Sequence, residues 1–314
     1  MSDESVAPNG SVDVGAVATY FRGLQQRVCG ALEHEEGSQL FEADPQPHPS
    51  GGLSYPMIAH GGQVVEKAAV NFSHSKGEAL PAAATQRRPE FAGCGFEALA
   101  ISLIVHPLNP YVPTTHANLR LFVVYRGTEV RDWWFGGGFD LTPYYGFKED
   151  AIHWHQTAFD ACAPFGDDIY GRCKSWCDDY FYLPHRGETR GVGGLFFDDW
   201  RRDGFSQSFA FVRSVGDHFL NGYLPIMQRR KEMGYGETQR AFQLYRRGRY
   251  VEFNLVYDRG TQYGLQSGRR TETVMASMPP VVHWRYKFTP EAGTPEAELY
   301  ETFLKPQDWL NLDG

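Results

Sequence analysis

The sequence lacks the features that mark several common classes of protein. No apolar run approaches the roughly 20 residues needed to cross a bilayer. The formal net charge is −8, whereas a general nucleic-acid binder is basic. The chain contains no dinucleotide fingerprint or nucleophile elbow, and the triplet Gly136-Gly137-Gly138 lacks the Gly-Lys-Ser/Thr ending of a phosphate loop. These absences argue against a membrane span, a nucleic-acid binder and a nucleotide-dependent enzyme.

Cysteine is also scarce, and its spacing carries no motif. The chain has five cysteines in 314 residues, an odd number, and none of them belongs to a Cys-x-x-Cys pair. They are Cys29, Cys94, Cys162, Cys173 and Cys177. The segment 1–10 is acidic and polar, unlike a signal peptide. We therefore expect reduced thiols and a cytoplasmic location.

Apolar and aromatic side chains, by contrast, are abundant. At 42% hydrophobic and 15% aromatic residues, the chain can bury a large core. No linker, repeat or low-complexity stretch divides it. We predict a single domain over residues 1–314, with residues 1–11 as a flexible tail.

Hydrophobic periodicity predicts an α+β fold. Steps of three and four residues predict helices at 12–36, Glu149–Cys162, Asp168–Tyr182, from Phe205 onward, and Tyr235–Arg247. Alternation predicts about seven strands, at Val64–Phe72, Leu99–His106, Thr115–Tyr125, Trp133–Leu141, Gly193–Phe197, Tyr250–Tyr257 and Val281–Lys287. Hairpin connections mix with helical excursions. We predict a large, mostly antiparallel sheet flanked by helices on both sides.

Two of the predicted strands place polar side chains on one face of the sheet. His116, Asn118 and Arg120 alternate with apolar residues, and so do Ser102 and His106 in the strand before. The eight-residue connection between these strands allows them to lie antiparallel and adjacent. A lone histidine on a strand is more often structural than functional, but five polar groups on adjoining faces predict a binding site.

The stretch 250–287 carries a second group of candidates. Tyr250–Tyr257 predicts a strand with Glu252 and Asn254 on its polar face, and it runs into Asp258-Arg259-Gly260. The following loop is rich in glycine and arginine, which is typical of a backbone that approaches an anionic ligand. A short helical turn at Thr271–Ser277 would precede the last strand. A surface hairpin with scattered charges is the alternative, and Asp258 would then simply cap a turn.

The candidate residue types suggest a ligand and a chemistry. Arginine forks bind carboxylates in bidentate fashion, so several arginines around a flat apolar floor predict a planar polycarboxylate ligand. These arginines are Arg120, Arg259, Arg269 and Arg270. Histidines transfer protons near neutral pH, and an aspartate on the same wall can accept or hold one.

Several long motifs together resemble a known family. They are 101–107 (ISLIVHP), 115–120 (THANLR), 136–144 (GGGFDLTPY), 177–181 (CDDYF) and the run Tyr250–Tyr286. In this order they resemble oxygen-dependent coproporphyrinogen III oxidase, and the similarity extends over nearly all of the chain beyond the first predicted helix.

The resemblance implies an activity and an assembly. The propionates on rings A and B of coproporphyrinogen III would be oxidatively decarboxylated to vinyl groups, giving protoporphyrinogen IX in haem biosynthesis. Oxygen would be the oxidant, with no cofactor required beyond it. The family's fold, a seven-stranded antiparallel sheet between helices in a homodimer, agrees with the predicted strands. Val282, Trp284 and Tyr286 on one face of the last predicted strand are the candidate dimer interface.

The resemblance also implies roles for individual residues. It places catalysis on His116, Asp258 and Arg259, and substrate contacts on Ser102, Asn118, Leu119, Arg120, Gly268, Arg269 and Arg270. The segment Gly268-Arg269-Arg270 departs from the family's Gly-Gly-Arg at its second position.

Two alternatives to this enzyme stay open. The first is a metalloenzyme, in which a divalent ion is held by His106, His116, His155 and His185, although their spacing matches no metal motif. The second is a tetrapyrrole-binding or carrier module that performs no turnover.

Overall fold

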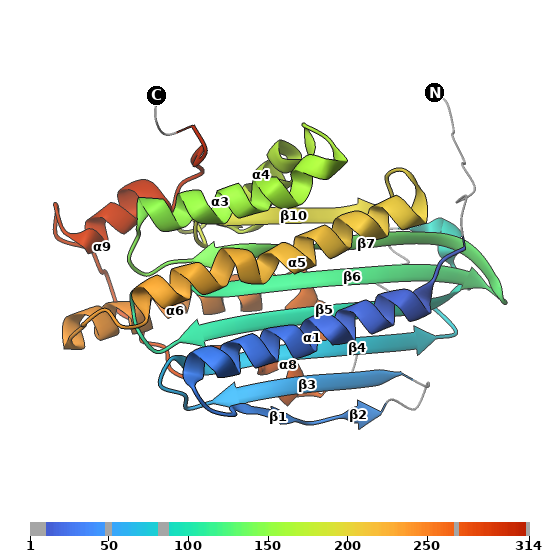
Figure 1. Ribbon diagram of the computed structural model, residues 1–314, viewed down its shortest axis with the longest axis horizontal. Helices are drawn as coiled ribbons and strands as arrows, with labels where there is room; N and C mark the ends of the chain where they lie inside the picture. Colours follow the sequence, from blue (N-terminus) through green and yellow to red (C-terminus); the bar gives the residue numbers. More distant parts are fainter. Residues whose placement is uncertain (1–10, 48–51, 81–87, 267–269, 312–314) are drawn as a thin grey trace.

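The computed structural model describes residues 11–47, 52–80, 88–266 and 270–311, and these form an α+β fold (Figure 1). One eight-stranded sheet has the order β1-β3-β4-β5-β6-β7-β10, with β2 also paired to β3, and every pairing is antiparallel. The predicted fold class is confirmed. The strands of the sheet are β1 Phe41–Ala43, β2 Gln46–Pro47, β3 Leu53–His60, β4 Val65–Gly77, β5 Gly95–Pro107, β6 Thr114–Arg126, β7 Glu129–Thr142 and β10 Gly193–Trp200.

Helices cover both faces of this sheet. They are α1 Val14–Glu36, α3 Lys148–Cys162, α4 Ile169–Tyr180, α5 Gly204–Arg230, α6 Glu237–Val256, α7 Arg259–Gln266, α8 Thr271–Met275 and α9 Pro295–Glu298. A separate two-stranded hairpin joins β8 Tyr182–Leu183 to β9 Glu188–Thr189. Within the described ranges, no helix combines the length and the apolar composition that crossing a membrane requires.

The first helix shows how the sequence pattern becomes packing. Val17, Phe21, Leu24 and Val28 recur on one side of α1 and are buried against the sheet. Asp13 caps the helix by accepting the Ala16 N–H at 2.8 Å. In Figure 1, α1 and α5 lie across the same face of the sheet. The apolar faces of the strands, including Leu99, Ile101, Leu119 and Leu121, form the main core there.

The strand predicted at Tyr250–Tyr257 is wrong, because Tyr250–Val256 continues helix α6, and Tyr257 follows as its C-terminal cap. Phe242, Tyr245, Tyr250 and Phe253 are buried at helical spacing, whereas Leu255, which the strand reading placed on an apolar face, is 46% exposed. Eight residues can satisfy a period of two by chance. The longer stripe of apolar residues that begins at Phe242 has the period of a helix, and no proline interrupts the segment.

The strand predicted at Val281–Lys287 is also wrong, because the segment forms no sheet pairing. It runs instead against α6, where the Trp284 ring lies over Gly248 and the Arg285 guanidinium lies over the Tyr245 and Phe288 rings. An extended segment alternates its side chains whether or not it joins a sheet. The alternation of Val282, Trp284 and Tyr286 therefore did not identify a strand, and the last two of these side chains are 58% and 90% exposed.

Candidate active site

A cavity of about 1010 Å³ lies on the face of the sheet opposite α1 and α5. Strands β4 to β7 and β10 form one wall, which we call the sheet wall, and residues of α6, α7 and α8 form the other, the helical cover. The lining combines aromatic side chains with polar and charged ones. Those that matter below are Ser102, His116, Asn118, Arg120, Tyr180, Arg190, Asp198, Asn254, Asp258 and Arg259.

The register of β5 and β6 brings the predicted polar patch together. Ser102 lies opposite Asn118, and Ile104 lies opposite His116. Asn118 Nδ2 donates to the Ile101 carbonyl at 3.2 Å, and Arg120 donates to Asn118 Oδ1 at 3.0 Å. The expected grouping of Ser102, His116, Asn118 and Arg120 on one face is confirmed.

His106 of the predicted patch, and Leu119, which the resemblance places among the substrate contacts, do not line the cavity. His106 is fully buried, with one ring nitrogen 3.2 Å from Thr114 Oγ1 and the other 2.9 Å from the Ser277 carbonyl. Burial, reinforced by the positive charge of Arg247, holds its pKa well below the ordinary value. Leu119 packs into the core on the opposite face of the sheet.

The glycine triplet of β7 allows its neighbours to approach closely. Gly138 has φ 141°, and a Cβ atom there would overlap the Leu195 carbonyl of β10. A Cβ atom at Gly137 would overlap the Asn118 carbonyl of β6. Gly137 and Gly138 therefore allow close sheet pairing at the cavity, where any larger residue would separate the strands that carry Asn118 and Asp198.

A buried chain of charged groups stands behind His116. Its Nδ1 lies 2.9 Å from Asp140 Oδ1, and Arg190 donates to both oxygens of that carboxylate at 2.7 and 2.8 Å. Burial alone would raise the pKa of Asp140, but the charge of Arg190 and the bond to His116 outweigh it and hold the pKa below the ordinary value. An ionised Asp140 can only accept, so His116 Nδ1 carries hydrogen and Nε2 is the atom that can take up a proton.

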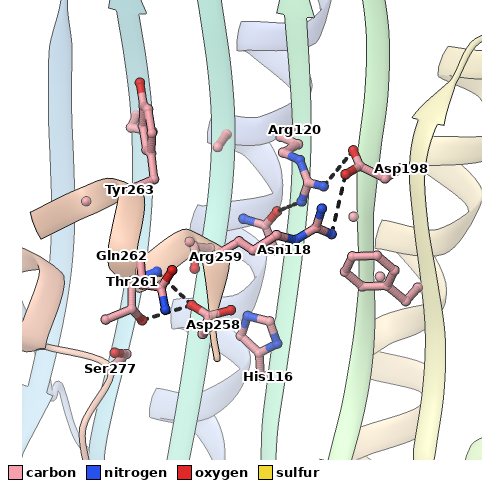
Figure 2. Close-up of a pocket in the computed structure, with 18 of the residues that line it drawn as sticks. His116, Asn118, Arg120, Asp198, Asp258, Arg259, Thr261, Gln262, Tyr263 and Ser277 are labelled. Carbon is pink, nitrogen blue, oxygen red and sulfur yellow. Dashed lines mark hydrogen bonds and ion pairs between the residues drawn. The ribbon is translucent and has the colours of Figure 1, made fainter. Parts of the chain in front are cut away.

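Asp258 sits where the helical cover meets the cavity. Its Oδ2 accepts from the Thr261 N–H at 2.7 Å and from Thr261 Oγ1 at 2.8 Å, which caps the start of α7. Its Oδ1 accepts from the Tyr180 hydroxyl at 3.0 Å. The capping role considered as an alternative is therefore real, and the carboxylate also lines the cavity (Figure 2).

Arg120 from the sheet wall and Arg259 from the helical cover meet at one carboxylate. Asp198 lies 2.8 Å from Arg120 and 3.5 Å from Arg259, and Figure 2 shows the two guanidinium groups reaching it together. Burial opposes ionisation of Asp198, but the two arginines outweigh it and hold its pKa below the ordinary value. Two of the predicted arginines thus lie together at the cavity.

The remaining candidates lie elsewhere or outside the described ranges. Arg270 does not line the cavity, is half exposed and pairs with Asp44 at 2.8 Å. Gly268 and Arg269 lie outside the described residues. No role in the cavity follows for any of these three from the described contacts.

The four histidines considered as metal ligands are held by separate partners. His155 is buried in α3, 3.0 Å from the Tyr170 hydroxyl and 2.8 Å from the Val192 carbonyl, and burial lowers its pKa to about 4. His185 is 3.1 Å from both Tyr257 Oη and Glu252. In the part of the chain that the structure describes, no group of three or more histidine, cysteine, aspartate or glutamate residues could hold a metal ion.

Four residues of the site were not singled out from the sequence as site residues: Asp140, Tyr180, Arg190 and Asp198. Asp140 lies in β7 and Asp198 in β10, at positions that alternation assigns to the cavity face, so the same periodicity could have found them. Arg190 comes from the loop before β10, and its place depends on tertiary packing against Phe181, Tyr250 and Phe253. No local pattern signals that position.

The fold and the site together describe an enzyme-like cavity. It lies on one face of an antiparallel sheet, and its lining combines aromatic side chains, clustered arginines and acid–base groups. Such a cavity suits a flat, carboxylate-bearing ligand. The family model for coproporphyrinogen III oxidase matches residues 16–309 of the chain. The chain belongs to this family, whose activity is an oxidative decarboxylation in haem biosynthesis.

Proposed function

We propose that this protein is the oxygen-dependent form of coproporphyrinogen III oxidase and needs no cofactor beyond oxygen. It converts the ring A and ring B propionates of coproporphyrinogen III to vinyl groups and releases protoporphyrinogen IX. The observation that carries the proposal is that Arg120, Arg259, His116 and Asp258 all line one cavity of about 1010 Å³. Carboxylate anchors and proton-handling groups are therefore within reach of one bound molecule.

Each group has a role that fits its surroundings. Arg120 and Arg259 hold propionate carboxylates, with Ser102 and Asn118 beside them on the sheet wall. Asp258, with its carboxylate at the cavity, accepts hydrogen bonds from pyrrole N–H groups and stabilises positive charge that develops on the ring. His116 exchanges protons at Nε2 while Asp140 holds Nδ1.

The overall step balances with oxygen as the oxidant. In each propionate, the bond to the carboxylate breaks, carbon dioxide leaves, and the electron pair of that bond forms the new double bond. A hydride equivalent leaves from the carbon next to the ring. One oxygen molecule accepts this hydride together with a proton, which His116 relays, and becomes hydrogen peroxide. The protein supplies binding, orientation and proton transfer, and the electrons come from the substrate.

The test is incubation of the purified protein with coproporphyrinogen III, in air and under argon. We expect oxygen uptake in air and protoporphyrin fluorescence after final oxidation of the products, and neither under argon. Substrate binding without oxygen uptake would identify a tetrapyrrole carrier instead. Equal turnover under argon would contradict the oxygen-dependent activity.

We also propose that the protein acts as a homodimer in the cytoplasm. Trp284 and Tyr286 remain largely exposed although their segment is not a strand, and exposed aromatic side chains are typical of interface cores. All five cysteines are free and buried, which fits a reducing compartment. Light scattering should give a mass near twice 35.5 kDa. A fully active monomer at micromolar concentration would contradict the dimer.

A further inference from the structure

Asp198 is the one acidic side chain in the described lining that joins the two arginines proposed to hold propionates. We propose that Asp198 is a positioning residue. It fixes Arg120 and Arg259 side by side and leaves them with a single surplus positive charge for one substrate carboxylate. This inference rests on the proposed function and assigns a role to a residue that does not itself react.

The backbone of β10 places this carboxylate. Phe196 faces the cavity and Phe197 faces the core, so regular alternation turns Asp198 toward the cavity. A β-bulge then follows between Phe197 and Trp200, and Asp199 within it adopts φ 49°. The extra residue returns Trp200 to the core side, against Phe211, and aims Asp199 at Arg88. Bulges and left-handed non-glycine residues of this kind occur next to functional sites, where they redirect side chains.

The neighbouring strand leaves room for the ion pair. A Cβ atom at Gly136 of β7 would lie 2.7 Å from Arg120 Cζ and 2.7 Å from Asp198 Oδ1. Glycine is therefore the residue that lets the guanidinium and carboxylate meet over the strand. The backbone at this position does not require glycine for its φ angle, so space is the reason for it.

Charge counting gives the consequence for binding. Two guanidinium groups less one carboxylate leave a surplus of one positive charge in the cluster of Arg120, Arg259 and Asp198. Asp198 is mostly buried and its pKa is held below the ordinary value, so it stays ionised at neutral pH. The cluster can then bind one propionate and release it after reaction. Without Asp198, the surplus would be two charges, and the guanidinium groups would repel each other and lose their shared orientation.

The test compares Asp198→Asn with wild type for kcat, KM and the Kd of coproporphyrin III, measured by its fluorescence. We expect kcat to fall roughly 10- to 100-fold, because misplaced anchoring groups would hold the substrate away from its reactive position. We expect KM not to rise and coproporphyrin III to bind more tightly, because the surplus charge has grown. A change in structure alone would instead weaken binding.

A matched control and a second variant complete the design. Asp168 also bridges two arginines, Arg172 and Arg202, but at the surface and away from the cavity, so Asp168→Asn should leave all three constants unchanged. Gly136→Ala displaces the Arg120–Asp198 pair without changing charge. It should lower kcat without tightening the binding of coproporphyrin III. If Asp198→Asn does not fold, this variant tests whether the Arg120–Asp198 pair positions the arginine.

The outcomes separate this proposal from the proposed function. Absence of turnover by the wild-type protein in air would refute the function, and the Kd comparison would still decide on Asp198. An Asp198→Asn enzyme whose kcat and coproporphyrin III affinity match those of Asp168→Asn would overturn the positioning role. A raised KM with unchanged kcat would overturn it as well, because Asp198 would then contribute only to uniform binding.

Discussion

The sheet wall and the helical cover hold their charged groups in different ways. Behind His116 of the wall, Asp140 of β7 pairs with Arg190 of the loop before β10. The two side chains are only 3% and 2% exposed, and they bond to His116 and Asn254. On the cover, Arg259 is 39% exposed and reaches Asp198 only at 3.5 Å. The wall holds His116 and Asp140 through sheet pairing and buried partners, whereas Arg259 on the cover is more exposed and more loosely paired. The proton relay at His116 is therefore held by buried partners, whereas Arg259, the carboxylate anchor from the cover, is not.

The largest expected effect comes from breaking the buried pair of the wall. Asp140→Asn removes the charge that compensates a fully buried Arg190, and an uncompensated buried charge is expensive. We expect the free energy of unfolding to fall by about 3–5 kcal/mol, measured by denaturant titration. Turnover should fall too, because His116 loses the carboxylate, which can only accept and therefore fixes the hydrogen on Nδ1, whereas an asparagine amide can also donate.

The control for this variant is an arginine–aspartate ion pair that is exposed to solvent. Arg27 and Asp217 lie 2.7 Å apart, but both side chains are about half exposed. Asp217→Asn should change the free energy of unfolding by less than about 1 kcal/mol. Equal destabilisation by the two variants would show that burial does not distinguish the wall from the surface.

The next effect concerns the carboxylate of the cover. Asp258→Asn preserves the size of the side chain, and asparagine caps helices about as well as aspartate, so α7 should keep its start. If the negative charge acts mainly in the transition state, turnover should fall by roughly 100-fold or more. Melting temperature and turnover, measured on one preparation, report the two roles separately.

Thr261→Val is the matched control for Asp258→Asn. It removes the hydroxyl that donates to Asp258 but keeps the backbone N–H that the cap requires. The loss of one hydrogen bond should lower stability by about 1 kcal/mol and leave turnover near wild type. If Asp258→Asn were destabilised yet turned over normally, the carboxylate would be a cap and nothing more.

The two regions also differ in how far the sequence predicts them. On the wall, alternation in β5 and β6 assigned the two faces of these strands correctly, because a strand in a sheet with one apolar core face must alternate. On the cover, the same rule applied to Tyr250–Tyr257 was wrong. Eight residues can match both the period of a strand and that of a helix, and only the longer apolar stripe from Phe242 onward shows that the segment is a helix. Arg190 and its aromatic neighbours meet only through tertiary packing, which no local window contains.

The helices behind the wall supply a pH-dependent contribution of intermediate size. The pKa of His155 is lowered to about 4 by burial, from an ordinary 6.5. Between these values the unfolded chain binds a proton that the folded protein excludes, so stability falls as pH drops from about 6.5 toward 4. The depressed pKa of His106 acts in the same direction. His155→Gln should make the slope of stability against pH shallower by up to about 1.4 kcal/mol per pH unit. An unchanged slope would contradict the lowered pKa, because it would mean that His155 binds its proton equally well in the folded and the unfolded chain.

The smallest expected effect follows removal of metal ions, which should leave turnover unchanged. A metal site built from His106, His116, His155 and His185 would have to draw ligands from several regions of the molecule at once. In His106, His155 and His185 both ring nitrogens already have protein partners, and a ligating imidazole needs a free lone pair. Only His116 has a nitrogen without such a bond among the described contacts.

We therefore expect turnover to survive dialysis against a strong chelator, measured as oxygen uptake with coproporphyrinogen III. The comparison sample is the same protein resupplied with manganese or ferrous iron, which should show no gain. Loss of activity on chelation and its return with either metal would require histidines that now have separate partners to rearrange around an ion. The rigid proton relay at His116 would then have to be replaced by metal chemistry.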